Sequence, residues 1–317
     1  MKVLVTGGAG FIGSNLVRHL VSARQHEIAV LDNLSVGLTE HTLPHEARFL
    51  RGDFTDRDTM AQALRGIDVV VHLAALSGVI DSVEDPQPSF EVNVAGSFRM
   101  LDLARRLGVR KVICASTGGA LLGDVAPPIS ESHAPSPLSP YGASKLAMEG
   151  YCSAFAGSYG LACATVRFSN VYGPFSGHKK SVVAAFIKQA LHGKPLMVYG
   201  DGTQERDYLF VGDLVRGVEA VIAGEIVGTY QLGSGQPTSL LALIEALNVI
   251  AGRDLEVHRE PARRGEVHRT WCDVSKARQA FGFATPTALP DGLRATWNWF
   301  ADNRSSWEGL THMVSAD

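Results

Sequence analysis

A doubly wound parallel α/β sheet, followed by a smaller α/β lobe, is the fold that the sequence predicts. Three observations support this prediction. Short apolar runs rich in β-branched residues alternate with longer helical patterns through the first two-thirds of the chain. A glycine-rich segment joins the first apolar run to the first helical pattern. The 317 residues, of which 45% are hydrophobic and 19% charged, suit one large or two unequal globular domains.

The expected strands are near-continuous apolar runs, which are typical of strands covered on both faces of a parallel sheet. They lie at residues 2–6, 28–32, 48–51, 69–72, 111–115 and 163–167. The helices expected between them lie at residues 12–23, 57–64, 90–107 and 141–159. Because the two kinds of element alternate, helices should cover both faces of the sheet, and ligands should bind at the carboxyl ends of the strands.

The pattern loosens from about residue 169, where glycine-rich loops such as 199–202 separate the helical stretches. The helices expected here lie at residues 182–192, 213–223 and 240–251. We therefore expect two parts, residues 1–168 and residues 169–317, between which the chain can cross. The second part should pack over the carboxyl ends of the strands, next to the ligand site.

Charge and cysteine usage argue against several classes of protein. The chain has 29 Lys and Arg residues against 32 Asp and Glu residues, and a net charge of −3 disfavours a nucleic-acid-binding surface. The cysteines at 114, 152, 163 and 272 form no C-x-x-C pair, so we expect buried thiols in a reducing compartment and no metal site. A strand follows Met1 directly and no run of about 18 apolar residues occurs, so we expect a cytoplasmic protein without membrane contact.

Gly7, Gly10 and Gly13 stand at the spacing G-x-x-G-x-x-G between the first strand and the first helix. Without side chains they permit a tight turn, close approach of a pyrophosphate and close packing of helix on strand. The amino end of the helix also offers free N–H groups and a positive dipole to phosphates. This segment therefore predicts a dinucleotide site in a Rossmann-type domain.

Acidic residues follow the second and third strands. Asp32 ends the second strand, where a carboxylate accepts hydrogen bonds from both ribose hydroxyls and repels a 2′-phosphate. This position favours NAD over NADP as the cofactor. Asp53, after the third strand, could accept a hydrogen bond from the adenine amino group, or it could be a solvated turn residue.

Tyr141 and Lys145 lie four residues apart at the start of a predicted helix, so both side chains can point into one cleft. A free phenol has a pKa of about 10 and is a poor base at neutral pH. A nearby ammonium and the positive nicotinamide ring of NAD⁺ would stabilise the phenolate and lower that pKa. In a chain that also has a dinucleotide-binding segment, this pair predicts a catalytic base and its partner. The alternative is an exposed tyrosine and a solvated lysine.

These features, in this order, resemble those of the extended short-chain dehydrogenase/reductases, and specifically of their NAD-dependent nucleotide-sugar epimerases and dehydratases. The resemblance covers roughly residues 1–300. In the first part it rests on T-G-G-A-G-F-I-G at 6–13, D-N-L at 32–34, G-D at 52–53, H-L-A-A at 72–75, E-V-N-V at 91–94, the segment 116–123 and Y-G-A-S-K at 141–145. It continues through S-N-V-Y-G-P at 169–174, G-D-G-T-Q-E-R-D at 200–207 and A-R-R-G-E at 262–266.

The resemblance implies roles for the matching residues. Tyr141 takes a proton from a sugar hydroxyl while hydride passes to NAD⁺, and Lys145 holds the cofactor ribose and tunes the tyrosine. A hydroxyl at the end of the fifth strand shares the hydrogen bond of the substrate, and Thr117 is preferred over Ser116, although both could simply cap backbone. The residues implied to contact the cofactor are Gly7, Gly10, Phe11, Ile12, Gly13, Asp32, Asn33, Asp53, Phe54, Leu73, Ala74, Ala75, Asn93, Tyr141 and Lys145.

The resemblance also implies that a UDP-sugar is the substrate. The residues implied to hold it are Asn170, Tyr199, Arg206, Arg263 and Glu266. The two arginines match arginines that bind the diphosphate, for which bidentate guanidinium groups are well suited. The asparagine matches a residue that bonds the same group, the tyrosine an aromatic beside the base, and the glutamate an acid on the nucleoside ribose. The alternative for Arg206 is a local ion pair with Asp207.

Epimerisation of a UDP-hexose at C4 is the reaction that these residues favour. It needs the tyrosine–lysine pair, bound NAD⁺ and a cavity in which a 4-keto sugar can turn. A 4,6-dehydratase needs a further acid and base, and dehydratases of the family carry Asp-Glu where this chain has Gly118 and Gly119. A glucuronate decarboxylase and a binding-only protein are weaker alternatives. The sequence leaves open whether the sugar is glucose, an N-acetylhexosamine or glucuronate, and whether the pathway is galactose metabolism, polysaccharide biosynthesis or a natural product.

Three positions depart from the family pattern. Leu122 replaces a tyrosine, which removes a polar group expected near the sugar. Ser77 replaces a lysine that some hexose epimerases carry, which could admit a bulkier or differently charged sugar. Arg264 stands where proline is common, so the backbone of that loop could differ. The segment 178–180, His-Lys-Lys, is interpreted as a solvated loop rather than a substrate clamp.

Members of the family commonly form dimers through two long helices of each subunit, which correspond here to residues 90–107 and 141–159. Phe98, Leu101 and Met148 could contribute to such an interface, or they could face the sheet. The resemblance therefore implies a homodimer.

Overall fold

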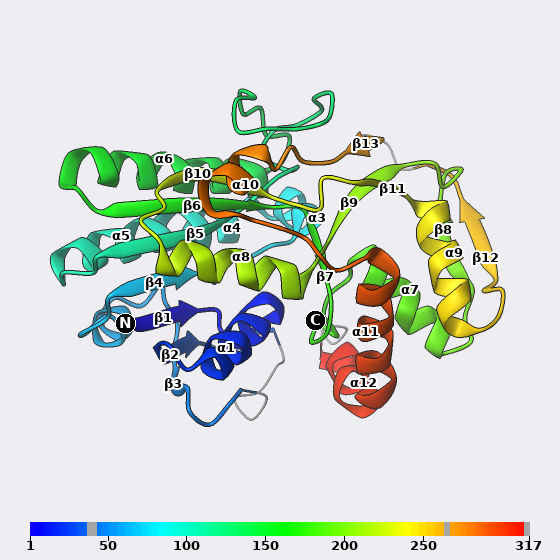
Figure 1. The fold of residues 1–317 in the computed structure, drawn as a ribbon, viewed down its shortest axis with the longest axis horizontal. Helices are drawn as coiled ribbons and strands as arrows, with labels where there is room; N and C mark the ends of the chain where they lie inside the picture. The colour runs from blue at the N-terminus through cyan, green and yellow to red at the C-terminus, as the bar shows by residue number, and fades with distance from the viewer. Residues whose placement is uncertain (37–42, 263–266, 314–317) are drawn as a thin grey trace.

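The fold is built around a seven-stranded parallel sheet (Figure 1). In the computed structural model, which describes residues 1–36, 43–262 and 267–313, the strand order is β10-β6-β5-β4-β1-β2-β3. The bounds of these strands are β1 Lys2–Thr6, β2 Glu27–Asp32, β3 Arg48–Arg51, β4 Val69–His72, β5 Lys111–Thr117, β6 Ala162–Phe168 and β10 Gly228–Leu232. Every neighbouring pair of strands is parallel.

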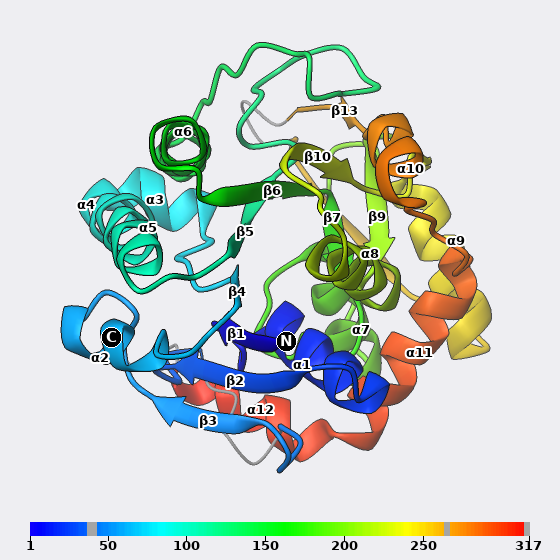
Figure 2. The ribbon, with the colours of Figure 1, turned by 60° about the vertical axis from the view of Figure 1, so that its left-hand side comes forward.

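Helices cover both faces of this sheet (Figure 2). One face carries α1 (Phe11–Ala23) and α8 (Val211–Ala223), and the other carries α2 (Arg57–Ala63), α5 (Ser97–Arg106) and α6 (Pro140–Tyr159). Successive side chains of a strand point to opposite faces, so Val3 belongs to the apolar core under α1 and α8, whereas Leu4 belongs to the core under α5 and α6. The predicted doubly wound α/β sheet is confirmed.

All six predicted strands are present, and β5 extends beyond its predicted end to Thr117. The seventh strand, β10, was missed because its sequence G-T-Y-Q-L has no continuous apolar run, and its parallel pairing with β6 alone places it in the sheet. Both β10 and α8 come from the second part of the sequence but lie with the first sheet. The chain therefore crosses between the two parts, and the division at residue 168 stays a proposal.

The helix predicted at residues 90–107 consists of two elements. The short helices α3 (Val79–Glu84) and α4 (Pro86–Ser89) lead into η2 (Phe90–Gly96), which has π-helical hydrogen bonding and continues directly into α5. An apolar pattern of period 3.6 does not reveal such a π turn. Segments of this kind are rare and occur often at functional sites.

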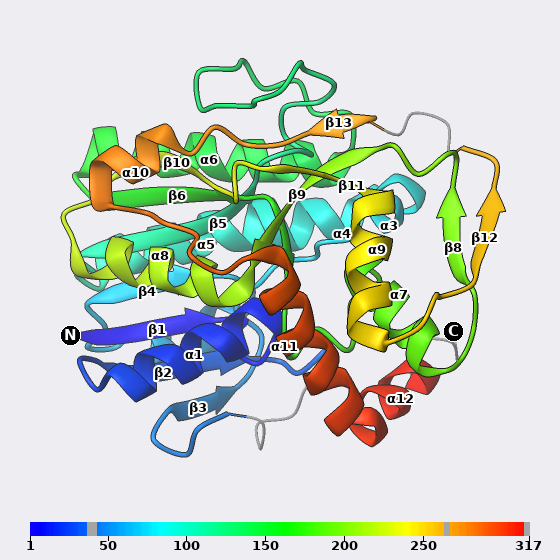
Figure 3. The ribbon, with the colours of Figure 1, turned by 45° about the vertical axis from the view of Figure 1, so that its right-hand side comes forward.

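The second part of the chain lies beyond the carboxyl ends of the parallel strands (Figures 1 and 3). Its strands are β7 (Asn170–Tyr172), β9 (Glu205–Phe210), β11 (Pro237–Ser239) and β13 (Arg269–Thr270) in one small sheet, and β8 (Leu196–Tyr199) and β12 (Val257–Glu260) in another. Its helices are α7 (Val182–Leu191), α9 (Leu240–Ala251), α11 (Leu289–Asp302) and α12 (Arg304–Met313), and α10 (Ser275–Phe281) packs beside β10. Ile187, Leu243 and Phe300 belong to its separate apolar core. Within the described residues of both parts, no helix is long and apolar enough to cross a membrane.

Candidate active site

The glycine-rich segment turns the chain from β1 into α1 and leaves the amino end of that helix open. Gly7 has a φ of 70°, and a Cβ there would lie 2.7 Å from the backbone nitrogen of Ala74. A Cβ at Gly13 would overlap the carbonyl oxygen of Gly7, so only glycine allows α1 to pack this closely on the loop. Gly10 is the N-cap of α1 and no side chain caps the helix, which leaves its first N–H groups for a ligand.

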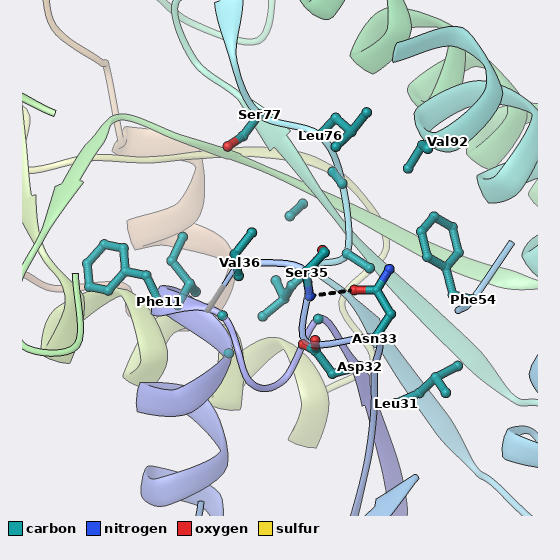
Figure 4. A pocket seen from close by; sticks show the side chains of 18 of the residues that line it. Phe11, Leu31, Asp32, Asn33, Ser35, Val36, Phe54, Leu76, Ser77 and Val92 are labelled. Carbon is teal, nitrogen blue, oxygen red and sulfur yellow. Dashed lines mark hydrogen bonds between the residues drawn. The ribbon is translucent and has the colours of Figure 1, made fainter. Parts of the chain in front are cut away.

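Asp32 ends β2 at the wall of a cavity that begins at this segment (Figure 4). Its carboxylate accepts the backbone N–H of Ala9 at 2.9 Å and that of Leu34 at 2.7 Å. Burial raises the pKa of the Asp32 carboxyl, and these two hydrogen bonds oppose that shift. Each oxygen still has a lone pair for a ligand, because a carboxylate accepts about four hydrogen bonds.

Asp53 is fixed next to Asn33, which Figure 4 shows on the loop after β2 with its side-chain oxygen accepting the N–H of Ser35. Asn33 Nδ2 donates to Asp53 Oδ2 at 2.9 Å, and the backbone and hydroxyl of Thr55 donate to Oδ1 at 2.8 and 2.7 Å. Burial works against the charged form of Asp53, but the hydrogen bonds from Thr55 and Asn33 hold its pKa below the ordinary value. Hydrogen bonds thus hold the Asp53 carboxylate in place at the cavity wall, and its contact with the adenine stays a prediction.

One cavity joins these residues to the predicted catalytic pair. Of the residues predicted to contact the cofactor, those that line it are Gly7, Gly10, Phe11, Ile12, Gly13, Asp32, Asn33, Asp53, Phe54, Leu73, Ala74, Ala75, Tyr141 and Lys145. Asn93, the remaining predicted residue, does not line the cavity but supports residues that do. Its side chain exchanges two hydrogen bonds of 2.9 Å with the backbone of Leu76 and donates to Ser144 Oγ at 3.0 Å. It therefore joins the loop after β4 to α6 and positions the residues that line the cavity.

Tyr141 and Lys145 both reach this cavity from the first turns of α6, as their spacing predicts. The N–H of Tyr141 donates to Ser82 Oγ at 3.1 Å, which ties the start of the helix to α3. Lys145 Nζ donates to the carbonyl oxygen of Ala115 at 3.0 Å and lies 5.9 Å from the centre of the Tyr141 ring. The carbonyl of β5 thus holds the ammonium in place beside the phenol.

Burial affects the two titratable groups in opposite directions. It raises the pKa of Tyr141 to about 12 and lowers the pKa of Lys145 to about 8, because each group loses hydration of its charged form. The low phenol pKa expected for the complete site is therefore not a property of the protein chain by itself. At this distance the attraction of one ammonium does not offset the desolvation of the phenolate.

Ser116 and Thr117 end β5 with different surroundings. Ser116 lines the cavity, is buried, and its Oγ has no hydrogen-bond partner among the described residues. Thr117 is not one of the described residues that line this cavity, and its Oγ1 accepts the N–H of Ala120 at the long distance of 3.4 Å. Successive strand residues point to opposite sides, so the two hydroxyls cannot serve the same position.

Two of the predicted substrate residues share a second cavity. Asn170 and Arg206 both line it, on the neighbouring strands β7 and β9. Asn170 Nδ2 donates to the carbonyl oxygen of Asp207 at 3.3 Å. Arg206 Nη1 donates to the carbonyl oxygens of Glu205 at 2.9 Å and His268 at 3.1 Å. These backbone bonds hold both side chains at the wall of the second cavity.

The carboxylate of Asp207, which was considered as an ion-pair partner of Arg206, accepts hydrogen bonds from other residues. It is buried and accepts the N–H groups of Ser234, Gly235 and Cys272 at 2.7 to 3.1 Å, as well as the hydroxyls of Ser169 and Ser234. Five donors satisfy this anion. Asp207 therefore anchors the loop after β10 to β9.

The remaining predicted substrate residues lie elsewhere. Tyr199 ends β8, and its carbonyl oxygen accepts a hydrogen bond from Gln204 Nε2 at 3.0 Å, but it lines neither of the two cavities. Arg263 and Glu266, together with the departure at Arg264, lie outside the described residues. Their roles stay predictions.

The prediction that the segment 178–180 is a solvated loop is wrong for two of its three residues. His178 and Lys179 line the cofactor cavity, and only Lys180 is exposed. Lys179 Nζ donates to Ser77 Oγ at 3.3 Å, across the cavity mouth from the loop after β4. Burial lowers the pKa of His178 to about 4 and also lowers that of Lys179. No spacing in the sequence indicates this contact, because it joins two distant loops.

Leu122, the departure from the family tyrosine, is fully buried in the core under α1 and α8. It is absent from the described walls of both cavities. The side chain at this position therefore serves packing, which explains why an apolar residue is accepted there.

The walls of the first cavity fit a dinucleotide. The uncapped amino end of α1 suits a diphosphate, and the fixed carboxylate of Asp32 suits two ribose hydroxyls while repelling a 2′-phosphate. The buried, unpartnered Oγ of Ser116 offers a donor at the other end, beside Tyr141 and Lys145. The cavity thus runs from a nucleotide-binding end to a proton-transfer end.

Comparison with known proteins gives the same assignment. A sequence model of the NAD dependent epimerase/dehydratase family matches residues 3–233. The UDP-glucose 4-epimerase of Mycolicibacterium smegmatis is 37% identical to this chain over 314 residues, which cover 95% of this chain and 98% of that protein. The likeness extends over nearly the whole length of both proteins.

Solved structures with the same fold include enzymes of two reaction types. The UDP-glucose 4-epimerase of Thermotoga maritima, determined with UDP-glucose, matches with a TM-score of 0.90 at 35% identity and covers 96% of this chain and 100% of its own. The dTDP-glucose 4,6-dehydratase of Streptomyces venezuelae, determined with NAD bound, matches with a TM-score of 0.90 at 33% identity and covers 98% and 100%. Equal TM-scores mean that the fold does not separate the two reactions, so the side chains must.

Proposed function

The chain belongs to the NAD dependent epimerase/dehydratase family, and on this premise we propose that it epimerises a UDP-hexose at C4. The sugar is glucose or galactose, an N-acetylhexosamine or glucuronate. The observation that supports the proposal best is the single cavity that joins the glycine segment and Asp32 to Tyr141, Lys145 and Ser116. NAD⁺, when bound there, supplies a hydride acceptor for the sugar carbon and later a hydride donor, so C4 passes through a ketone.

Tyr141 moves the proton in this proposal. Its Oη, as phenolate, accepts the proton of the C4 hydroxyl and later returns it to the C4 oxygen. Burial raises the pKa of Tyr141 to about 12, so the phenolate forms at neutral pH only with positive charge close by. Lys145 supplies one such charge from a position that the Ala115 carbonyl fixes. The base is therefore available mainly in the loaded enzyme.

We assign different ligands to the two hydroxyls at the end of β5. Ser116 lies in the wall of the cofactor cavity, so we assign its free Oγ to the cofactor side. Thr117 is the residue that matches the family hydroxyl and lies outside that wall, so we assign it to the sugar hydroxyl. Neither side chain has a strong hydrogen bond within the described protein that would have to break first.

The second cavity is the place that we propose for the sugar-linked diphosphate. Asn170 and Arg206 line it together, and a guanidinium group binds a diphosphate bidentately. Tyr199, Arg263 and Glu266 complete the proposed set, on the family resemblance. The sugar then extends from this cavity toward Tyr141.

Water elimination, the dehydratase alternative, lacks an acid in the described site. Gly118 and Gly119 stand where dehydratases of the family carry Asp-Glu, so neither position supplies a carboxylate. A Cβ at Gly118 would press on Gln231 Oε1 at 3.0 Å and Cys272 Sγ at 3.2 Å, whereas Gly119 has open space around it. The carboxylates among the described cavity-lining residues are Asp32 and Asp53, both at the nucleotide end. Epimerisation needs no further acid, and the site is consistent with that simpler reaction.

We further propose a homodimer through α5 and α6. Leu101 and Met148 are buried against the sheet and cannot belong to the interface, but Phe98 is 41% exposed. Its ring packs edge-on to Tyr151, which is 39% exposed, with 5.1 Å between ring centres. An exposed aromatic pair on two neighbouring helices suits a self-complementary contact. Sedimentation of the wild type as a monomer at micromolar concentration would contradict this proposal.

A cytoplasmic location is the proposal that best suits the cysteines. All four, at 114, 152, 163 and 272, are buried and free. Two of their sulfur atoms, on Cys114 and Cys152, lie 3.4 Å apart without a disulfide bond. Buried cysteines that form no disulfide suit a reducing compartment.

Products made from a panel of UDP- and dTDP-sugars test the proposed reaction. NMR time courses should show the C4 epimer of at least one UDP-hexose and no 4-keto-6-deoxy sugar. Formation of the 4-keto-6-deoxy product from UDP-glucose or dTDP-glucose would favour the dehydratase. Loss of carbon dioxide from UDP-glucuronate would favour the decarboxylase. Calorimetric binding across the panel without turnover would favour a binding-only protein.

A further inference from the structure

The loop between β7 and α7, residues 173–181, reaches back from the second part of the chain onto the helix that opens the cofactor site. Asn15 Nδ2 of α1 donates to the carbonyl oxygen of Pro174 at 3.0 Å. The guanidinium of Arg18 lies over the ring of Phe175, 4.5 Å from its centre. The β7–α7 loop is therefore attached to the first turns of α1 next to the uncapped amino end.

Hydrogen bonds within the second part hold the β7–α7 loop in one conformation. Lys188 Nζ, from α7, donates to the carbonyl oxygens of Gly177 at 3.1 Å and Lys179 at 2.9 Å. Ser176 Oγ donates to the carbonyl oxygen of Gly173 at 2.6 Å, and the N–H of Lys179 donates to the carbonyl oxygen of Ser176 at 2.9 Å. The side chain of Lys179 thus leaves from a positioned backbone.

The ammonium of Lys179 faces the cofactor cavity without a counter-charge. It donates to Ser77 Oγ at 3.3 Å, and no carboxylate of the described residues forms a salt bridge with it. His178, beside it in the cavity wall, has a buried Nδ1 that finds no hydrogen-bond partner in the described part of the chain. Burial lowers the pKa of Lys179 and works against its charged form, so an anion beside this ammonium would be favourable.

The anion that belongs in this cavity is a diphosphate. Lys179 shares the cavity wall with Gly10 and Phe11 at the amino end of α1, whereas Asn170 and Arg206 line the other cavity. Because Lys179 lines the cavity that holds the amino end of α1, and not the second cavity, we take the diphosphate of NAD as its anion. An ammonium binds such a group as a point charge.

We propose that Lys179 supplies, from the second part of the chain, the positive charge that binds the diphosphate of NAD, in place of the lysine that some hexose epimerases carry at position 77. Ser77 leaves room for this ammonium and orients it through its hydroxyl. The cofactor then connects the two parts of the chain. This inference rests on the proposed function, because it needs NAD in the first cavity.

Calorimetric titration of NAD into cofactor-free protein tests the inference. Lys179→Met keeps the length of the side chain and removes its charge, and it should weaken NAD binding at least tenfold, as expected for one lost hydrogen bond to a charged group. Lys180→Met, the exposed neighbour, is the matched control and should bind like the wild type. The double variant Ser77→Lys/Lys179→Met restores an ammonium on the other loop and should recover most of the affinity. Added salt should weaken NAD binding by the wild type more than by Lys179→Met.

Several outcomes overturn the inference without touching the proposed reaction. Equal NAD affinity of Lys179→Met and wild type, with both folded by circular dichroism, would do so. A loss confined to UDP, titrated into NAD-loaded protein, would assign Lys179 to the substrate instead. If the folded double variant binds NAD as weakly as Lys179→Met, a lysine at position 77 cannot replace Lys179, and that part of the inference is wrong. Failure of the wild type to bind NAD would instead contradict the proposed function itself.

Discussion

The Nζ atom of Lys145 lies 5.9 Å from the centre of the Tyr141 ring, one helical turn further along α6. Both groups are in a site where burial is costly for charge, so the phenol pKa is raised to about 12 and the ammonium pKa is lowered to about 8. In the chain by itself the pair is therefore a neutral phenol beside an ammonium that loses its proton more readily than usual. The geometry is preformed, but the protonation state needed for catalysis has to be produced by ligands.

Tyr141→Phe removes the oxygen that accepts the proton and keeps the ring. We expect kcat to fall by about 10² to 10⁴-fold, the usual contribution of a positioned acid–base group, with NAD binding and the free energy of unfolding nearly unchanged. NMR of the C4 epimer, calorimetry and urea denaturation measure the three quantities. Tyr159→Phe, an exposed tyrosine at the end of the same helix, is the control and should turn over normally. Full activity of Tyr141→Phe would exclude it as the base.

The free energy of unfolding should rise with pH because of Lys145. Its pKa is 10.5 in an unfolded chain and about 8 in the folded one, so the unfolded state binds more protons between these values and stability increases as the pH rises from about 8 to 10.5. The gain is on the order of 3 kcal/mol at about 1.4 kcal/mol per pH unit. Lys145→Met lacks this titration. Urea denaturation should therefore show that, between pH 7 and pH 10.5, the free energy of unfolding rises more for the wild type than for Lys145→Met. An equal change in both proteins would contradict the lowered pKa.

Asp32→Ala should weaken NAD binding about tenfold or more, because charge-assisted hydrogen bonds to the ribose are lost. It should also reduce the preference for NAD over NADP, since the carboxylate no longer repels a 2′-phosphate. Asp53→Ala is the matched comparison, from the same wall of the cavity. We expect it to weaken both cofactors alike. Calorimetry with each cofactor decides, and an unchanged preference in Asp32→Ala would rule out the proposed ribose contact.

Ser116→Ala and Thr117→Ala should have separable effects because the two hydroxyls lie on different sides of β5. Ser116 lines the cofactor cavity, so its loss should raise the Kd for NAD several-fold. Thr117 lies outside that wall, so its loss should lower kcat by about tenfold and leave the Kd for NAD unchanged. Titration calorimetry and steady-state kinetics measure these effects. A reversed result would exchange the two roles.

Gly13→Ala should destabilise the fold although alanine favours helices. The added Cβ would overlap the carbonyl oxygen of Gly7 and the Cα of Gly8, and this backbone cannot move away without shifting the glycine segment. We expect a loss of about 2 kcal/mol or more in the free energy of unfolding, with weaker NAD binding. Gly157→Ala, a helical glycine with open space around it, is the control and should gain up to about 1 kcal/mol. Similar stabilities of the two variants would contradict the packing argument.

The sequence by itself determined the features that depend on covalent spacing. Glycines three residues apart between a strand and a helix, an acid at the end of the next strand, and a tyrosine four residues before a lysine have few alternatives once the period of each element is known. Gly10, Asp32 and Tyr141 accordingly line one cavity. The family resemblance is confirmed for the same reason, because its motifs are local.

Tertiary structure decided which residues from distant segments meet. Lys179 and Ser77 are 102 positions apart, and no periodicity relates them, so their contact depends on how the β7–α7 loop packs on α1. The missed strand β10 joins the sheet only through its pairing with β6, and only the packing of α5 shows that Leu101 faces the apolar core. Burial of the Tyr141–Lys145 pair, and with it the direction of both pKa shifts, likewise arises only in the folded chain, where α6 packs on β5 and β6.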